Sequence, residues 1–290
     1  MRDIRSIYEF RAGCTAVRML KAAGHKAYFV GGCVRDEMTR RMSRPSAEDI
    51  FGSCRYARAL TDEPHLRGSS NMIDIDITTS ATPEEMMRVF HGMKIIKTGI
   101  KHGTITLIAE ADGGDAPQNE SGADQRTGGQ AGSEILAECG ESDKSVRMAP
   151  LEITTYRTES GYSDCRHPDS VGFTRSLEED LKRRDFTVNA LVMDENGSVT
   201  DILGASEDLR NRVLRAVGDP DERFREDALR IMRAMRFASV LGFRIEEKTE
   251  AAMFRNGGLL KKLSVERVFS EFRKLVTGKY APDVVRRYID

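Results

Sequence analysis

The segment Ile73-Asp74-Ile75-Asp76-Ile77-Thr78 constrains the fold of this 290-residue chain more than any other feature. Isoleucine alternates strictly with a polar residue, which is typical of a β-strand with one buried face. Side chains of a strand point alternately to its two faces, so Asp74 and Asp76 are expected to share the open face. Two carboxylates displayed in this way can hold divalent cations for phosphoryl transfer. A solvated strand face is the commoner explanation of such a pattern taken alone.

Composition indicates an ordinary globular protein that is long enough for two domains. Hydrophobic residues make up 39% and the net charge is −1, so no global field draws the chain to nucleic acid. The five cysteines are scattered without a CxxC pair, which favours a reducing compartment over a zinc site or a disulfide framework. No apolar run approaches the ~20 residues that span a bilayer, and the charged N-terminus does not resemble a signal peptide. We therefore expect a cytoplasmic protein with no membrane contact.

Hydrophobic periodicity predicts an α+β protein. Strands are expected over 26–30, 73–78, 104–108, 151–156 and 186–192, and helices over 6–23, 34–41, 177–183, 224–241, 247–254 and 264–276. A further helix is expected to begin at Thr82-Pro83-Glu84-Glu85, which has the form of a capping box with proline at the first helical position.

Two stretches of the chain have no apolar pattern. These are about 43–71 and 109–149, and we predict that both are loops inserted into the first domain. The order of the elements predicts a head domain over 1–218, with a small mixed sheet flanked by helices. An all-α domain, here called the neck, is predicted over 219–290.

A glycine pair stands where a predicted strand meets a predicted helix, in Gly31-Gly32-Cys33-Val34-Arg35-Asp36. Glycine lets backbone N–H groups approach a phosphate closely, and a helix N-terminus and Arg35 would add positive potential. A tight turn followed by a surface arginine explains the same hexapeptide equally well.

The glycine pair followed by Asp-x-Asp-x-x-Thr resembles the class II nucleotidyltransferases, the family of tRNA CCA-adding enzymes and bacterial poly(A) polymerases. Further matches follow in the family's order and skip the two predicted loops. They are Thr98-Gly-Ile-Lys-His-Gly-Thr104, Glu152-Ile-Thr-Thr-Tyr156, Tyr162-Ser-Asp-Cys-Arg-His-Pro168, the segment 176–190 containing Arg183-Arg184-Asp185, the segment 223–237 containing Glu226-Asp227-Ala-Leu-Arg230, and Ser264-Val-Glu-Arg267.

The resemblance implies a two-metal site. Asp74 and Asp76 would be the ligands of two Mg²⁺ ions, and Glu152 matches the family's third catalytic carboxylate. An ordinary acid at a strand edge is the alternative for Glu152. The resemblance also places Gly31, Gly32 and Arg35 over the phosphates of the nucleotide.

Arg184, Asp185 and Asn189 resemble the element that holds the ribose. A 2′-hydroxyl both donates and accepts hydrogen bonds, so an arginine beside an aspartate can test for it. The alternative is a charged helix C-terminus, where basic residues are favourable.

Asp227 and Arg230 match the residues that read the base, and their spacing makes them neighbours on one helix. A carboxylate accepts and a guanidinium donates, which complements the amino donor and ring-nitrogen acceptor of cytosine and adenine but not uracil or guanine. Arg233 and Arg236 match further nucleotide-binding positions. Because each step of three residues turns the helix face, all four side chains cannot meet one base, and the last two could equally be paired with acids.

The resemblance implies template-independent addition of CMP and AMP from CTP and ATP to a tRNA 3′ end. Poly(A) synthesis, addition of AMP alone, and a truncated relative that only binds nucleotide or RNA share these motifs. Family members usually continue into body and tail helices that hold RNA, which we expect to be absent here. From residue 219 onward there are 16 Lys and Arg against 12 Asp and Glu, a weak basic excess. The sequence does not indicate an oligomeric state.

Overall fold

A computed structural model describes residues 8–43, 74–110, 148–162 and 170–288. The two predicted loop insertions lie almost entirely outside the described residues. Strands and helices are mixed, as predicted, and a seven-stranded sheet has the order β3-β4-β5-β2-β1-β8-β9. Its strands are β1 (Ala27–Val30), β2 (Asp76–Thr79), β3 (Lys94–Ile96), β4 (Thr104–Glu110), β5 (Met148–Thr155), β8 (Val192–Met193) and β9 (Val199–Thr200). Only the β2–β5 pair is parallel among these neighbours.

One face of the sheet forms the main core. Ile75 and Ile77 are buried, as the alternating pattern predicts; β2 begins at Asp76, and Ile73 of the predicted strand lies outside the described residues. Helix α1 (Tyr8–Ala22) packs against β1, β2, β4 and β5, and the Phe10 ring stacks on Phe29 with centroids 4.5 Å apart. Burial of Ile75 and Ile77 on this face leaves Asp76 and Thr78 of β2 on the other.

The capping box predicted at Thr82 is confirmed. Helix α3 (Pro83–Val89) begins with proline, and the Thr82 hydroxyl accepts a hydrogen bond from the Glu85 amide at 3.3 Å. The Glu85 carboxylate accepts one from the Thr82 amide at 2.7 Å. The backbone amides of Thr82 and Glu85, at the N-terminus of the helix, are therefore both hydrogen-bonded by side chains that are close in the sequence.

A smaller core covers the opposite face over β1. Leu181 of α4 (Leu177–Lys182) packs there with Val30, Ala190, Val192 and Val217. Helix α2 (Gly32–Met42) follows β1, and α5 (Ala205–Arg210) lies beside it. A separate hairpin pairs β6 (Arg157–Ser160) with β7 (Ser170–Phe173).

The strand predicted over 186–192 is wrong for most of its length. Residues Thr187–Asn189 form a 3-10 turn, and only Val192 and Met193 enter the sheet. Phe186 and Val188 are fully buried, but the polar residues that alternate with them, Thr187 and Asn189, are also buried. The apolar alternation reflects burial on all sides of a turn and not the two faces of a strand.

The C-terminal part is mainly helical as predicted, but the short strand β11 (Arg244–Ile245) shows that it is not all-α, and the last helix, α10, was not predicted. This part contains α6 (Pro220–Glu226), α7 (Leu229–Leu241), α8 (Glu247–Asn256), α9 (Val265–Val276) and α10 (Ala281–Tyr288). The single helix predicted over 224–241 is wrong, because the chain is extended at Asp227 with φ −139°. The Asp227 carboxylate accepts a hydrogen bond from the Leu229 amide at 3.1 Å, a side-chain contact that competes with continuous helix.

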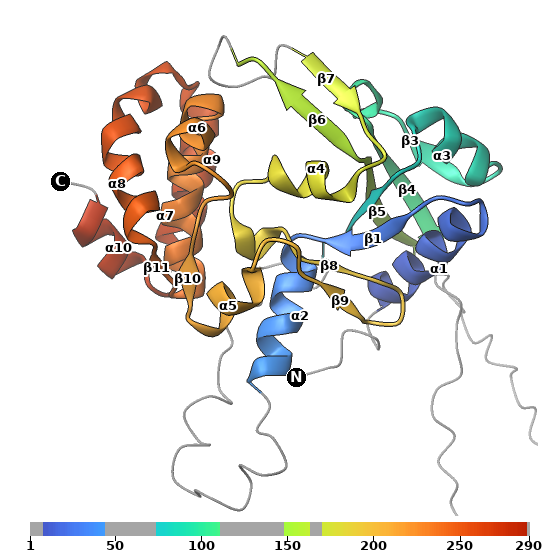
Figure 1. Cartoon of the computed structure of the whole chain (residues 1–290), viewed down its shortest axis with the longest axis horizontal. Helices are drawn as coiled ribbons and strands as arrows, with labels where there is room; N and C mark the ends of the chain where they lie inside the picture. Colours follow the sequence, from blue (N-terminus) through green and yellow to red (C-terminus); the bar gives the residue numbers. More distant parts are fainter. Residues whose placement is uncertain (1–7, 44–73, 111–147, 163–169, 289–290) are drawn as a thin grey trace, which may run out of the picture.

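A strand pair and an aromatic contact join the predicted head to the predicted neck. Strand β10 (Val213–Leu214) pairs in parallel with β11 (Arg244–Ile245). The Phe186 and Phe237 rings meet edge to face with centroids 5.8 Å apart. Figure 1 shows α6 to α10 gathered at one end of the molecule, away from α1 and α3. The division at residue 218 stays a prediction. In the described ranges, no helix has the length and apolar character needed to cross a membrane.

Candidate active site

Two carboxylates from neighbouring strands lie together on the polar side of the sheet. Asp76 of β2 pairs in register with Glu152 of the parallel strand β5 and with Val30 of β1. Residues in register on adjacent strands project to the same face. The chain then turns at Gly31, whose φ is +81°, and a Cβ added there would lie 3.3 Å from Asp76 Oδ2. The glycine turn therefore packs directly against this carboxylate.

Negative charge is crowded at Asp76. Burial and the neighbouring Glu152 raise its pKa to about 6; Arg184 opposes this rise and Asp74 adds to it. In the described ranges no three or more His, Cys, Asp or Glu side chains are arranged to hold a metal ion, so Asp74, Asp76 and Glu152 do not form a closed cage. The observation that fits a cation is the carboxylate crowding, because a bound positive charge would relieve it.

Arg35 is not the surface arginine of the alternative interpretation. It is 8% exposed, and its guanidinium donates to Asp36 at 2.7 Å and to Asn189 Oδ1 at 2.9 Å. The turn from β1 into α2 therefore directs Arg35 toward the segment that carries Asp185 and Asn189. The fold brings Arg35 and Asn189 into contact although 154 positions separate them in the sequence.

Asp185 continues this polar chain into the neck. It accepts hydrogen bonds from Asn189 Nδ2 at 3.1 Å and from Arg233 Nε at 2.9 Å. Burial acts to raise the pKa of Asp185, but Arg233 and the hydrogen-bond donors lower it to about 2. Asp185 is 9% exposed and bound to Arg233, so it is more than a solvated charge at a helix end; the arginines before it do follow the C-terminus of α4, as the alternative states.

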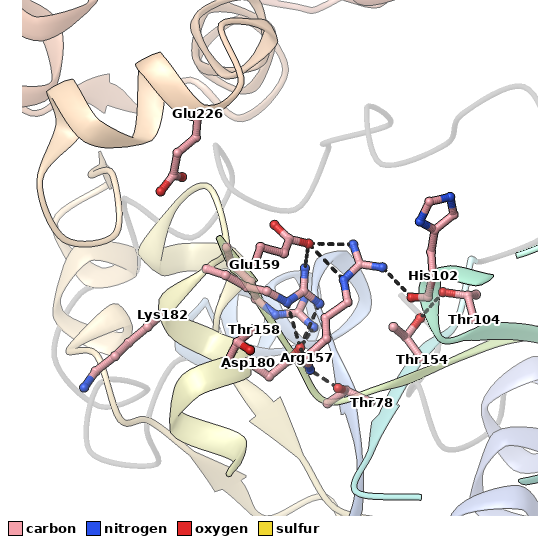
Figure 2. Close-up of polar contacts among 12 residues, drawn as sticks. Thr78, His102, Thr104, Thr154, Arg157, Thr158, Glu159, Asp180, Lys182 and Glu226 are labelled. Carbon is pink, nitrogen blue, oxygen red and sulfur yellow. Dashed lines mark hydrogen bonds and ion pairs between the residues drawn. The ribbon is translucent and has the colours of Figure 1, made fainter. Parts of the chain in front are cut away.

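Arg184 is held by a carboxylate that the sequence analysis did not single out. Its Nη2 donates to Asp180 Oδ2 at 3.1 Å, and Asp180 is fully buried. Figure 2 shows Asp180 with Thr78 on one side and Glu159 on the other. The only sequence signal at Asp180 is an acidic first turn, which is ordinary for a helix and gives no hint of burial.

The two predicted base-reading residues have separate partners. Asp227 pairs with Arg267 of α9 at 3.1 Å, whereas Arg230 binds Glu226 Oε2 at 2.6 Å. The prediction that Asp227 and Arg230 are neighbours on one helix is therefore wrong, because the chain breaks between α6 and α7. Arg267 and Glu226 lie inside recognised motifs, but spacing alone could not pair them.

Arg233 and Arg236 are both paired with acids, which confirms the alternative stated for them. Arg233 binds Asp185, and Arg236 Nε lies 2.5 Å from Glu271 Oε2 of α9. The Arg236 guanidinium also lies over the Phe237 ring, 3.8 Å from its centroid. These contacts fix α7 between the head and α9.

Comparison with known proteins defines the class to which this fold and site belong. The family described as poly A polymerase head domain matches residues 27–119 and 118–215. A second family, described as a probable RNA- and SrmB-binding site of polymerase A, matches 242–290. The chain therefore belongs to the poly(A) polymerase head-domain family.

The individual proteins that resemble this chain have a more specific description than the family does. The chain is 41% identical over 274 residues to a CCA-adding enzyme of Lactobacillus helveticus, covering 94% of this chain and 52% of that protein. It is 38% identical over 281 residues to one of Bacillus cytotoxicus, covering 97% and 54%. The crystal structure of a Bacillus stearothermophilus CCA-adding enzyme with CTP matches with a TM-score of 0.66 at 36% identity, covering 96% of this chain and 51% of that one. The chain thus spans about half the length of the curated relatives it matches.

Proposed function

We propose that this chain carries the nucleotide-transferring part of a template-independent RNA 3′-terminal nucleotidyltransferase. The reaction adds CMP and AMP to the tRNA 3′ end and releases pyrophosphate. The observation that carries the proposal is the in-register apposition of Asp76 and Glu152 beside the Gly31 turn. The relatives described above are CCA-adding enzymes, which agrees with the proposal.

Asp74 and Asp76 would hold two Mg²⁺ ions, with Glu152 as the third carboxylate. The chemistry that such ions supply is activation of the attacking 3′-hydroxyl and neutralisation of triphosphate charge. The carboxylates themselves concentrate negative charge where those cations are needed, as the raised pKa of Asp76 indicates. The Gly31-Gly32 turn leaves room for phosphate oxygens next to them, because it carries no side chain.

The remaining site residues would bind the sugar and the base. Asp185, Asn189 and Arg35 are already joined by hydrogen bonds, which would hold a ribose-binding surface in place. Asp227 is 20% exposed in its side chain and binds Arg267, so its carboxylate would exchange this partner for the amino group of cytosine or adenine. Arg230 would donate to the ring nitrogen of the same base.

The test is extension of a tRNA that lacks its 3′ CCA by the purified 290-residue protein, with Mg²⁺ and one labelled nucleoside triphosphate at a time. CMP and AMP are expected to be incorporated and UMP and GMP to be rejected. The Asp76→Asn variant should abolish extension. Incorporation of UMP or GMP as readily as CMP would refute base reading by Asp227 and Arg230.

The same assay separates the two alternatives. The family description names polymerase A, so a long tail made from ATP alone would favour poly(A) synthesis, and a single AMP would favour A addition. The chain spans about half of each relative, so nucleotide binding without extension of any RNA would favour a relative that only binds.

A further inference from the structure

Asp180 lies at the meeting point of three elements of the candidate site. Its carboxylate is fully buried and accepts hydrogen bonds from Thr78 Oγ1 at 3.1 Å, Arg183 Nη2 at 2.7 Å and Arg184 Nη2 at 3.1 Å. The backbone amide of Arg157 donates at 3.4 Å. A buried carboxylate with several donors is rigid, because each oxygen is fixed from more than one direction.

The first link from Asp180 leads to the carboxylates of β2. Thr78 is two residues beyond Asp76 and projects to the same face of the strand. Arg184, held by Asp180, lies near enough to act electrostatically on Asp76. Asp180 therefore fixes both Thr78, a neighbour of Asp76 on the same strand, and Arg184, whose charge acts on Asp76.

The second link leads to the neck. The backbone carbonyl of Arg183 accepts a hydrogen bond from Arg230 Nη2 at 3.1 Å, and that of Lys182 accepts one from Arg223 Nη1 at 3.2 Å. Asp180 fixes this last turn of α4 by binding the Arg183 and Arg184 side chains. The position of Arg230 thus depends on the turn that Asp180 holds.

We propose that Asp180 is a positioning residue that couples the Asp76 carboxylate to the base-reading Arg230 through the C-terminal turn of α4. This role rests on the proposed function. It predicts that loss of the Asp180 charge weakens binding of the Mg²⁺–nucleotide complex and discrimination between bases together, although Asp180 touches neither ligand.

The test compares Asp180→Asn with a matched control, Asp208→Asn. Asp208 is likewise a buried aspartate, 3% exposed, but it binds Arg215 at 2.9 Å and Thr187 Oγ1 at 2.7 Å and makes no such contact with β2 or α4. Dissociation constants for CTP and UTP are measured by calorimetry with and without Mg²⁺, and stability by urea unfolding. Both variants are expected to lose stability, because each removes the charge of a buried carboxylate that pairs with arginine. The loss should be smaller for Asp208→Asn, because the side chain of its partner Arg215 is 49% exposed.

Of the two variants, only Asp180→Asn should change nucleotide binding and the preference for CTP over UTP. We expect its Mg²⁺-dependent CTP affinity to fall about 10- to 100-fold, the range for loss of a residue that orients metal ligands, and its CTP preference over UTP to shrink. Equal nucleotide binding by the two variants would overturn the positioning role while leaving the proposed function intact. Absence of Mg²⁺-dependent nucleotide binding by the unchanged protein would refute the proposed function and the positioning role with it.

If Asp180→Asn does not fold, Thr78→Val takes its place. This change conserves volume and removes one hydrogen bond to Asp180 without touching a charge. A loss of about fivefold in Mg²⁺-dependent CTP affinity is expected, the effect of one hydrogen bond. Unchanged affinity in Thr78→Val would overturn the link from Asp180 to β2.

Discussion

Asp76, a carboxylate of the candidate site, opposes folding when it is ionised. Burial and Glu152 raise its pKa to about 6, so its protonated form suits the folded chain better than its ionised form does. A carboxyl group whose pKa is raised contributes stability at low pH, and this contribution is lost as pH rises from about 4 through about 6. At neutral pH without metal, the ionised Asp76 therefore destabilises the fold.

The first prediction follows for Asp76→Asn. In EDTA at pH 7.5 the variant should be more stable than the unchanged protein by about 2 kcal/mol, because the buried like charge is gone. At pH 4 the two proteins should have similar stability, because Asp76 is then protonated. Urea unfolding at both pH values measures the difference. Lower stability of the variant at pH 7.5 would contradict the charge crowding.

The pKa of Asp185 is shifted in the opposite direction to that of Asp76, which gives the second prediction. Its pKa is lowered to about 2, mainly by Arg233 against the effect of burial, so its stabilising effect is complete above about pH 4 and is lost as pH falls toward 2. Asp185→Asn should destabilise the protein by about 3 kcal/mol at pH 7, since it leaves the Arg233 charge unmatched. The difference from the unchanged protein should narrow between pH 4 and pH 3 in urea unfolding. A constant difference would show that ionisation of Asp185 contributes nothing.

At the scale of elements, the sequence predicted best where the signal is local. The capping box at Thr82 and the buried face of β2 depend on neighbours within a few residues, and both are observed. The break at Asp227 was not predicted, because helix-forming residues flank it and only the contacts of its side chain favour the extended conformation. The turn at Thr187–Asn189 was missed because burial on every side imitates a strand pattern.

For the candidate site, too, the sequence identified residues within motifs but not their partners from distant elements. The family resemblance implied Asp76, Glu152, Asp185 and Asn189 as members, and their roles stay predictions. The structure pairs Asp76 with Glu152 in register and joins Asp185 to Asn189 and to Arg233 of α7. Partners from distant elements could not be predicted from one sequence. These include Asp180, Glu226, Arg267 and Glu271, each chosen by tertiary packing rather than by periodicity.

Helix α9 has an unusual distribution of side chains, which gives the third prediction. Its contacts with α7 include the buried Glu271 and Leu275, whereas Phe269 is 61% exposed. Leu275→Ala should destabilise the protein by about 3 kcal/mol, because it leaves a cavity in the core. Phe269→Ala should change stability by less than about 1 kcal/mol, because little of its apolar surface is buried. Thermal and urea unfolding of the two variants check the contrast, which equal effects would contradict.

At the scale of the whole molecule, polar and apolar contacts join the predicted head and neck. One hydrophobic cluster includes Phe29 of the sheet and Leu275 of α9. The β10–β11 pair and the Arg233–Asp185 ion pair cross the same junction. Contacts of this kind couple the unfolding of two regions, because neither can open without exposing the core of the other.

The last prediction is that the described head and neck unfold in one cooperative transition. Peptides from α1 and α9 should lose protection from hydrogen exchange at the same urea concentration, because the shared core links the two helices through α7. Mass spectrometry of the exchanged peptides measures each midpoint separately. The Asp185→Asn variant gives a more stringent test, because it removes the Arg233–Asp185 ion pair across the junction. The unfolding midpoints of the α1 and α9 peptides should both fall, and by the same amount. Loss of protection in α9 while α1 remains protected would show that residue 218 divides two independently folding units.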